Sequence, residues 1–141
     1  MILGSFPSVA SRKSGFFYMH PTNRFYKTLG ALFKEEEPLG TKDRKAFLTR
    51  HGIALYDVVE SCLVRGSSDS SIKEARPCDL RAILSACQTV KAIFVTGQKA
   101  YTLYRRYFSE PAFVLPSPSA ANASSSLADL VRAYGKILAF L

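Results

Sequence analysis

The sequence predicts an α/β fold, a small parallel sheet with helices on both faces, and three observations support it. Four short apolar segments, 1–4, 53–59, 91–96 and 112–115, have the length and composition of buried strands. Apolar residues recur at helical spacing between them, and strands that alternate with helices pair in parallel. With 141 residues the chain is long enough for a two-sided core, so we expect one domain over 1–141.

Helices are expected between and after these strands. The first two helices are predicted from the spacing of their apolar residues and from a residue that ends a helix. The starts of the other three are predicted from a proline, a glycine and a spacing that resembles a capping box. The serine-rich segment 61–76 is predicted to be a long loop. The expected helices are 22–34, 43–51, one that opens at Pro77, one that follows Gly97 and one that follows Ser126.

The formal net charge is +8, with 19 Lys and Arg against 11 Asp and Glu. Basic side chains that neutralise phosphates bind polyanions by releasing counterions. The basic residues are scattered along the chain and do not form a tail, so a folded basic face that meets nucleic acid is expected. A surface that is merely basic and soluble is the alternative.

Metals, cofactors and membranes are not expected. The 3 cysteines form no Cys-x-x-Cys pair and only 2 histidines occur, which disfavours zinc, iron–sulfur and disulfide frameworks. No apolar run reaches the roughly 18 residues of a membrane span, and segment 1–3 is too short for a secretory signal. We expect a cytoplasmic monomer without metal or cofactor.

Polar and aromatic residues follow the first predicted strand. That strand leads into a tight turn at 4–8, and the stretch 17–25 adds aromatic rings, an imidazole and an amide. Parallel α/β sheets bind ligands beyond the carboxyl ends of their strands. A second polar turn, 115–122, follows the last strand and would open at the same edge, so the two loops together predict a binding site.

Asn23 stands at or near a helix start, where an amide is typical of an N-cap. Its alternative role is to hold a water against a sugar carbon. An amide has no useful pKa for general-base catalysis, but it can orient a nucleophile when the leaving group departs on its own, as in hydrolysis of an N-glycosidic bond. The spacing alone favours the cap.

Tyr18 is a candidate for an aromatic ring on which a planar base stacks. The alternative is that it packs in the core. Ser5 and Phe6 offer backbone N–H groups suited to a ring carbonyl or a developing negative charge, and Gly4 permits close approach. His20 is a candidate for the same base pocket, although a residue before a proline is more often structural than catalytic.

The second loop carries the small hydrogen-bonding groups of Ser117, Ser119 and Asn122 in a proline frame that includes Pro118. Such a loop can bind a phosphate backbone through hydrogen bonds from its hydroxyl and amide groups. An ordinary turn between a strand and a helix is the alternative.

Ser5, His20 and Asp57 are also the residue types of a nucleophile, a base and an orienting carboxylate. The Gly-x-Ser-x-Gly turn of such enzymes is absent, and Ser5 precedes Phe-Pro instead of a helix. The sequence therefore does not favour a hydrolytic triad.

Five segments occur in the same order as in a known family and span nearly the whole chain. They are Gly4–Ser8, Phe17–Phe25, Gly52–Cys62, Gly66–Ile72 and Pro116–Ala123. Together they resemble the DNA-deoxyinosine (hypoxanthine-DNA) glycosylases of the uracil-DNA glycosylase superfamily. A more distant resemblance, through the His-Pro-x-Asn-Arg-Phe pattern, is to the mismatch-specific uracil/thymine-DNA glycosylases.

The resemblance implies a three-layer αβα sandwich with a four-stranded parallel sheet in the order 2-1-3-4. In the mismatch-specific relatives an asparagine of the first motif positions the water, and Ser5 stands there in this chain, so that route is missing. In the deoxyinosine branch the amide that matches Asn23 is catalytic, so the resemblance implies this role for Asn23. Tyr18 falls on the base-stacking position, and the loop 116–122 enters the minor groove. The expected base-binding residues are Gly4, Ser5, Phe6, Tyr18 and His20, and the expected DNA-binding residues are Ser8, Arg24, Lys99, Ser117, Pro118, Ser119 and Asn122.

Three features depart from the family pattern. The chain starts almost at the first motif, where relatives have a preceding segment, so a truncated or misassigned N-terminal segment is expected. Met19 replaces a usually small residue and is expected to narrow the pocket. Ala120 replaces a common proline and is expected to loosen its loop.

The expected function is hydrolysis of the N-glycosidic bond of a deaminated base, hypoxanthine or uracil, in duplex or single-stranded DNA during base excision repair. No lysine is convincingly placed for a Schiff base, so a monofunctional glycosylase without strand cleavage is expected. The alternatives are a mismatch-specific uracil/thymine-DNA glycosylase and a nucleic-acid-binding module without catalysis.

Overall fold

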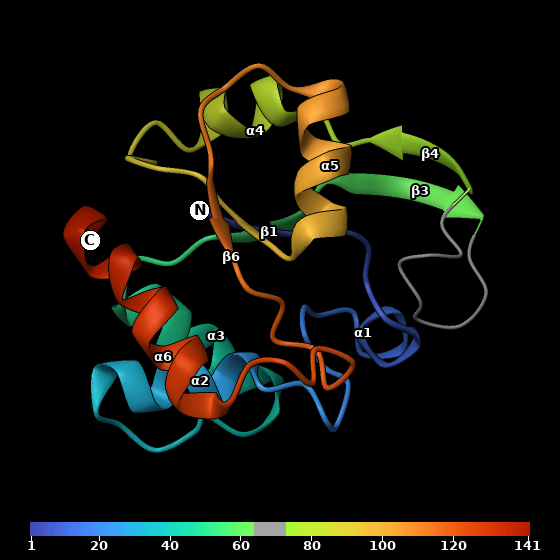
Figure 1. The fold of residues 1–141 in the computed structure, drawn as a ribbon. Helices are drawn as coiled ribbons and strands as arrows, with labels where there is room; N and C mark the ends of the chain where they lie inside the picture. The colour runs from blue at the N-terminus through green and yellow to red at the C-terminus, as the bar shows by residue number, and fades with distance from the viewer. Residues whose placement is uncertain (64–72) are drawn as a thin grey trace.

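A four-stranded parallel sheet forms the middle of the protein (Figure 1). The computed structural model describes residues 1–63 and 73–141. In spatial order the strands are β2 (Leu55–Asp57), β1 (Ile2–Gly4), β5 (Phe94–Thr96) and β6 (Phe113–Leu115). All three pairings are parallel. The order 2-1-3-4 of the four predicted strands is therefore confirmed.

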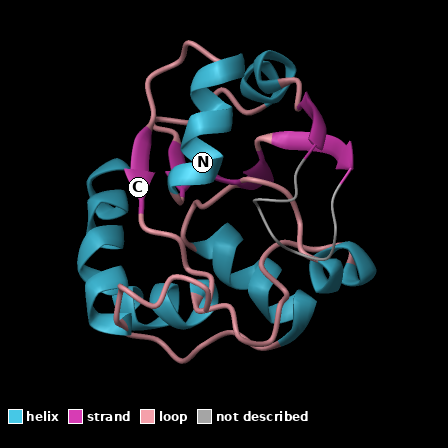
Figure 2. Ribbon diagram, turned by 45° about the vertical axis from the view of Figure 1, so that its right-hand side comes forward, coloured by secondary structure: helices cyan, strands magenta, loops and turns pink. Residues whose placement is uncertain are grey.

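Helices cover both faces of the sheet (Figures 1 and 2), which confirms the three-layer αβα architecture. One face packs against α2, α3 and α6, and the other against α4 and α5. A short helix α1 follows β1, and a 3₁₀ helix ends the chain. The bounds are α1 Val9–Ser14, α2 Phe25–Phe33, α3 Gly40–Arg50, α4 Leu80–Ala86, α5 Gln98–Tyr107, α6 Leu127–Tyr134 and the 3₁₀ helix Gly135–Phe140.

Alternation along each strand divides the core into two halves. Ile2 and Phe94 face the α2 and α6 side, whereas Leu3 and Val95 belong to the core beneath α4 and α5. All four side chains are almost fully buried. Because both faces are covered, these strands are continuous apolar runs, and this is why they can be recognised in the sequence.

The segment 61–76 is not one long loop. Residues Val59–Leu63 form β3 and Lys73–Pro77 form β4, and the two pair as an antiparallel ribbon beside the main sheet. Segment 64–72 of the predicted loop lies outside the described residues. Pro77 is the last residue of β4 and does not open a helix. The next helix starts at Leu80 instead, with Asp79 as its N-cap.

Other boundaries also differ from the predictions. The strand predicted over 53–59 is only Leu55–Asp57, since Val59 already belongs to the ribbon. The helix predicted over 22–34 begins at Phe25. Helix α1 carries no apolar periodicity long enough to predict it. Its ends are set by the Ser8 cap and by Gly15, whose φ of 65° is left-handed.

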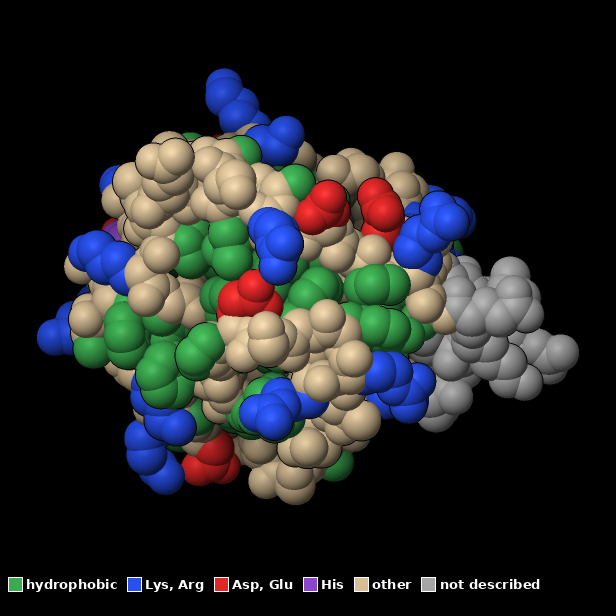
Figure 3. All heavy atoms as spheres, turned by 90° about the horizontal axis from the view of Figure 1, so that it is seen from above, with side chains coloured by type: hydrophobic (Ala, Val, Ile, Leu, Met, Phe, Trp, Pro, Cys, Tyr) green, Lys and Arg blue, Asp and Glu red, His purple; other side chains and the backbone are tan. Residues whose placement is uncertain are grey.

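Basic side chains are dispersed over the surface. Figure 3 shows Lys and Arg around much of the face above α4 and α5, with acidic and apolar groups between them. Within the described ranges, no helix is long and apolar enough to cross a membrane.

Candidate active site

A cavity of about 960 Å³ opens at the carboxyl edge of the sheet, where both predicted loops meet. The ends of β1, β2 and β5 form its floor, and the loop after β6 closes one side. Twelve predicted site residues line it: Gly4, Ser5, Phe6, Ser8, Tyr18, His20, Asn23, Lys99, Ser117, Pro118, Ser119 and Asn122. A smaller cavity of about 580 Å³ lies at the opposite edge of the sheet, away from these groups.

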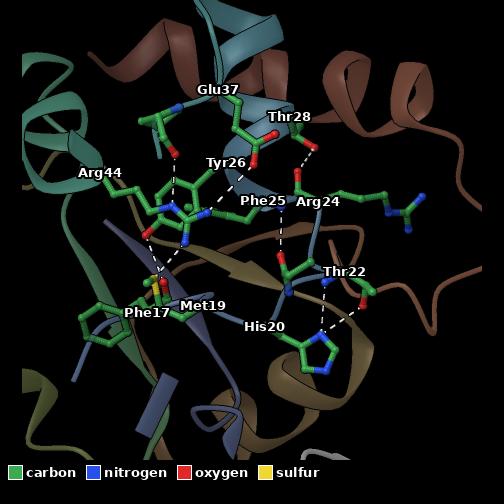
Figure 4. A network of polar contacts seen from close by, with 12 residues as sticks. Phe17, Met19, His20, Thr22, Arg24, Phe25, Tyr26, Thr28, Glu37 and Arg44 are labelled. Carbon is green, nitrogen blue, oxygen red and sulfur yellow. Dashed lines mark hydrogen bonds and ion pairs between the residues drawn. The ribbon is translucent and has the colours of Figure 1, made fainter. Parts of the chain in front are cut away.

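Asn23 lies just before α2 with its side chain fixed. Its Oδ1 accepts the backbone N–H of Phe25 at 2.9 Å, drawn as a dashed line in Figure 4. The amide therefore caps the helix, although Arg24 occupies the formal N-cap position. A carbonyl oxygen has two lone pairs, so the capping bond orients the amide and leaves it able to accept a second hydrogen bond from the cavity.

Tyr18 is held between the core and the cavity. Its ring stacks on Phe25 with centroids 3.9 Å apart and planes 11° apart, and its hydroxyl is 2.9 Å from Thr96 Oγ1. The backbone φ of 53° is uncommon for a non-glycine residue. Burial, reinforced by Tyr134 and Asp57, raises the pKa of Tyr18 well above its ordinary value. The hydroxyl thus stays protonated at neutral pH.

The strained backbone at Tyr18 is supported on both sides. The N–H of Met19 donates to Ser11 Oγ at 2.9 Å, and Tyr26 Oη donates to the carbonyl of Phe17 at 3.0 Å. Ser11 in turn belongs to α1, whose N-cap is Ser8. Ser8, predicted to contact DNA, therefore lines the cavity and also organises the helix that holds the Tyr18 loop.

Met19 points away from the cavity, toward Arg44 (Figure 4). Arg44 Nη1 donates to Met19 Sδ at 2.8 Å, and the guanidinium lies over the Tyr26 ring at 4.2 Å. Met19 is not among the residues that line the cavity. The expectation that it narrows the pocket is wrong, because the arginine holds its side chain behind the loop.

Arg24 is the predicted site residue that does not line the cavity. Its guanidinium is turned inward and donates to the carbonyls of Ser125, Ser119 and Asn122 at 2.5, 3.0 and 2.9 Å. Its backbone N–H donates to Pro118 O at 2.9 Å. The sequence pattern could not distinguish this arginine from one that binds phosphate. Here it ties the second loop to the start of α2, beside Asn23.

The second loop is braced internally. The side-chain amide of Asn122 donates to Ser117 O at 2.9 Å and to Ser125 Oγ at 3.1 Å, and Ser119 Oγ accepts from the N–H of Ala121. From α6, Tyr134 Oη donates to the carbonyl of Pro116. Ala120 lines the cavity. The hydrogen bonds named above involve residues that precede and follow it in the chain.

Two further predicted residues lie at the rim. Lys99 is exposed in the first turn of α5. His20 is also exposed, and its Nδ1 lies 3.0 Å from Thr22 Oγ1 and accepts the Thr22 N–H at 3.3 Å (Figure 4).

Asp57 also lines the cavity and is only 8% exposed. From the sequence it was a candidate only in a disfavoured triad with Ser5 and His20. It pairs in register with Gly4, and a Cβ added to Gly4 would lie 2.5 Å from Asp57 Oδ1 and 3.2 Å from Tyr18 Oη. Position 4 is thus a glycine because the protein's own carboxylate and hydroxyl fill the space. The strand predicted over 53–59 put Asp57 inside the strand, so its place at the strand end became visible only in the structure.

Comparisons with known proteins agree with this geometry. A model of the uracil DNA glycosylase superfamily matches residues 1–138. A curated relative from Methanosarcina barkeri, named hypoxanthine DNA glycosylase, is 28% identical over 128 residues, which covers 89% of this chain and 81% of the relative. One of the same name from Methanosarcina acetivorans is 30% identical over 125 residues, covering 86% and 79%.

The fold has a solved counterpart. A solution NMR structure from Methanosarcina acetivorans, described as a candidate uracil DNA glycosylase, matches with a TM-score of 0.75 at 27% identity and covers 97% of this chain and 89% of that one. The strand order, the site at the carboxyl edge and the superfamily match over nearly the full length lead to one assignment: the chain belongs to the uracil DNA glycosylase superfamily.

Proposed function

We propose that this protein is a DNA glycosylase that removes hypoxanthine from DNA in base excision repair. The relatives named hypoxanthine DNA glycosylase support the base, and the cavity supports the reaction. The observation that carries the proposal is the position of Asn23, whose amide lines the cavity in an orientation fixed by the N–H of Phe25.

The base enters the cavity after its nucleotide is extruded from the helix, which costs a few kcal/mol and least for a mispaired base. It stacks on the Tyr18 ring face opposite Phe25. Backbone N–H groups of Ser5 and Phe6 receive its ring carbonyl, and the loop 116–122 contacts the DNA backbone with its hydroxyls and peptide groups.

Bond cleavage follows a dissociative route. The C1′–N bond breaks, the base takes the electron pair as an anion, and the sugar becomes an oxocarbenium ion. Asn23 Oδ1 accepts a hydrogen bond from a water and holds its oxygen toward C1′. The new C1′–O bond leaves an abasic site, the excess proton passes to solvent, and the base anion is protonated. No step of this route uses a lysine amine, and the DNA strand stays intact.

Uracil is a second candidate base. Hypoxanthine and uracil both present a carbonyl beside a ring N–H, and the solved structural relative is described as a candidate uracil DNA glycosylase. A pocket that reads this pair of groups can accept either base, so the preference rests on how the cavity fits a purine or a pyrimidine.

The test is base release from oligonucleotides that hold one hypoxanthine, uracil or mismatched thymine, in single and double strands, with alkali to reveal abasic sites. Asn23→Ala is expected to lower hypoxanthine release about 100-fold or more, since one positioned polar group contributes on this scale. It also removes a helix cap, at about 1 kcal/mol.

Asp79→Ala is the matched control. Asp79 Oδ1 accepts the N–H of Ala82 at the start of α4, so this variant also loses a cap but leaves the cavity unchanged. It should lose similar stability and keep full activity. Equal loss of activity in both variants would contradict the role of Asn23. Tight DNA binding without release of any base would identify a binding module, and a borohydride-trapped complex would overturn the monofunctional assignment.

A further inference from the structure

We propose that Arg44 is a positioning residue for base binding, because it holds the turn that presents the Tyr18 ring to the cavity. The inference rests on the proposed function and deepens it, since it assigns a role in base binding to a residue outside the cavity. Arg44 belongs to α3 and does not line the cavity, and its side chain is 15% exposed. It acts through Met19 and Tyr26.

Tyr18 has a backbone conformation that needs support. Its φ of 53° lies in the left-handed region, which a residue with a side chain keeps only where surrounding contacts enforce it. Rotation about φ turns the peptide group that contains the carbonyl of Phe17. Rotation about ψ turns the peptide group that contains the N–H of Met19. The direction of the Tyr18 ring is therefore fixed where these two peptide groups are fixed.

Each of the two peptide groups has a hydrogen-bond partner in a helix. Tyr26 Oη, from α2, donates to Phe17 O at 3.0 Å. The N–H of Met19 donates to Ser11 Oγ of α1 at 2.9 Å. The turn 17–19 thus keeps its shape only while the Tyr26 ring and the Met19 residue stay in place.

Arg44 contacts both of them (Figure 4). Its guanidinium carbon lies 4.2 Å from the centre of the Tyr26 ring, and its Nη1 donates to Met19 Sδ at 2.8 Å. Its Nε donates to Pro38 O at 3.1 Å, and its Nη2 lies 4.0 Å from Glu37 Oε1. A planar guanidinium can lie on a ring and still donate from its edge. One side chain therefore anchors both supports of the turn to the segment before α3.

The ring face of Tyr18 opposite Phe25 is the one proposed to stack on the base. A turn that relaxes would tilt this face, and a misplacement of about 1 Å can cost about 100-fold in rate. Without Arg44 the ring still has its stack on Phe25 and its hydrogen bond with Thr96. The expected loss is therefore smaller, about 5- to 20-fold, which lies in the range that stacking of one base contributes.

The experiment measures single-turnover release of hypoxanthine at saturating protein, together with the Kd for an undamaged duplex. Arg44→Ala should slow release by the factor given above. It should change the Kd for undamaged DNA by less than about twofold, because the base meets the ring only after extrusion. A fall in affinity for undamaged DNA that accounts for the whole loss of activity would overturn the proposal.

Arg50→Ala is the matched control. Arg50 is also an arginine of α3 that pairs with a carboxylate and lies over an aromatic ring. Its partners, Glu35 and the Phe47 ring at 5.6 Å, are outside the turn 17–19. This variant should keep the wild-type rate of release, and a loss as large as that of Arg44→Ala would overturn the proposal.

A double-mutant cycle with Tyr18→Gly separates positioning from general stability. Glycine removes the ring and adopts a positive φ without a steric penalty, so the turn no longer needs support. In this background Arg44→Ala should change the remaining rate by less than about twofold, since the residue through which it acts is gone. The same loss in both backgrounds would assign Arg44 a merely structural role and overturn the proposal.

Met19→Leu guards against loss of folding, because it nearly conserves the volume and removes the sulfur acceptor. It should slow release by about two- to fivefold, the lower part of the range for one hydrogen bond. Wild-type rates in both Met19→Leu and Arg44→Ala would overturn the proposal.

An uncleavable duplex distinguishes this proposal from the proposed reaction. The probe carries one 2′-fluoro-2′-deoxyinosine, whose fluorine disfavours the oxocarbenium ion. The wild-type protein should bind it more tightly than undamaged DNA, and Arg44→Ala should reduce that preference. Absence of excision together with an Arg44-dependent preference would contradict the proposed reaction and support the positioning role. A preference that Arg44→Ala leaves unchanged would overturn the positioning role.

Discussion

At the scale of single residues, the absence of a side chain at position 4 decides what the site contains. Asp57 Oδ1 would lie 2.5 Å from a Cβ at Gly4. Gly4→Ala must therefore displace the carboxylate, and overpacking of this kind costs about 1–3 kcal/mol. Urea denaturation should show this loss of unfolding free energy.

A double-mutant cycle identifies the cause of that loss. In an Asp57→Ala background the same Gly4→Ala change should cost less, because the oxygen it meets is gone. Gly135→Ala is the control: its backbone is helical, with φ of −52°, and a Cβ there meets nothing within 4 Å. Equal costs of Gly4→Ala in both backgrounds would disprove the clash.

At the scale of secondary-structure elements, Arg24 connects the start of α2 with the loop between β6 and α6. It donates to three carbonyls of the loop. Arg24→Ala leaves these acceptors unpaired and is expected to lower the free energy of unfolding by about 2–3 kcal/mol. Amide hydrogen exchange in the loop 116–125 should accelerate more than elsewhere, and DNA affinity should fall.

Arg24→Lys should not rescue the loop, since a single ammonium cannot match the planar fork that reaches separate carbonyls. Arg132→Ala removes an exposed arginine of α6, whose partner is Asp129 in the preceding turn, and should change stability by less than about 0.5 kcal/mol. A lysine variant with wild-type exchange in the loop would show that only the charge matters.

At the scale of the whole molecule, buried tyrosines link stability to alkaline pH. Burial raises the pKa of Tyr18, Tyr26 and Tyr134 above the ordinary 10.0, and that of Tyr104 to about 12. The folded state holds these protons more tightly than the unfolded chain. Stability is therefore at its full value below pH 10 and falls as the pH rises toward 12.

Urea denaturation between pH 8 and 12 should show this fall, and absorbance of tyrosinate should rise together with unfolding. Tyr104→Phe removes one titrating group and should reduce the slope by about 1.4 kcal/mol per pH unit. An unchanged slope in this variant would exclude Tyr104 as a contributor.

Much of the fold could be predicted from the sequence because the relevant signals are local. Strands buried on both faces are apolar runs, such as Ile93–Val95, and the Ser126–Asp129 capping box was visible from its spacing. The ribbon β3–β4 was missed, because its segments are polar and two-stranded ribbons do not bury both faces. Helix α1 was too short to show a period.

The sequence by itself determined the chemical inventory of the protein: the two polar loops, the amide, the aromatic ring and the family pattern that joins them. Only the tertiary structure decided how these groups are used. Arg24 turns inward and Met19 turns away, whereas Asp57 lies against Gly4 at the cavity floor. The reason is physical: side-chain direction depends on contacts between segments distant in the chain, such as Arg24 with Ser125, which no local pattern contains.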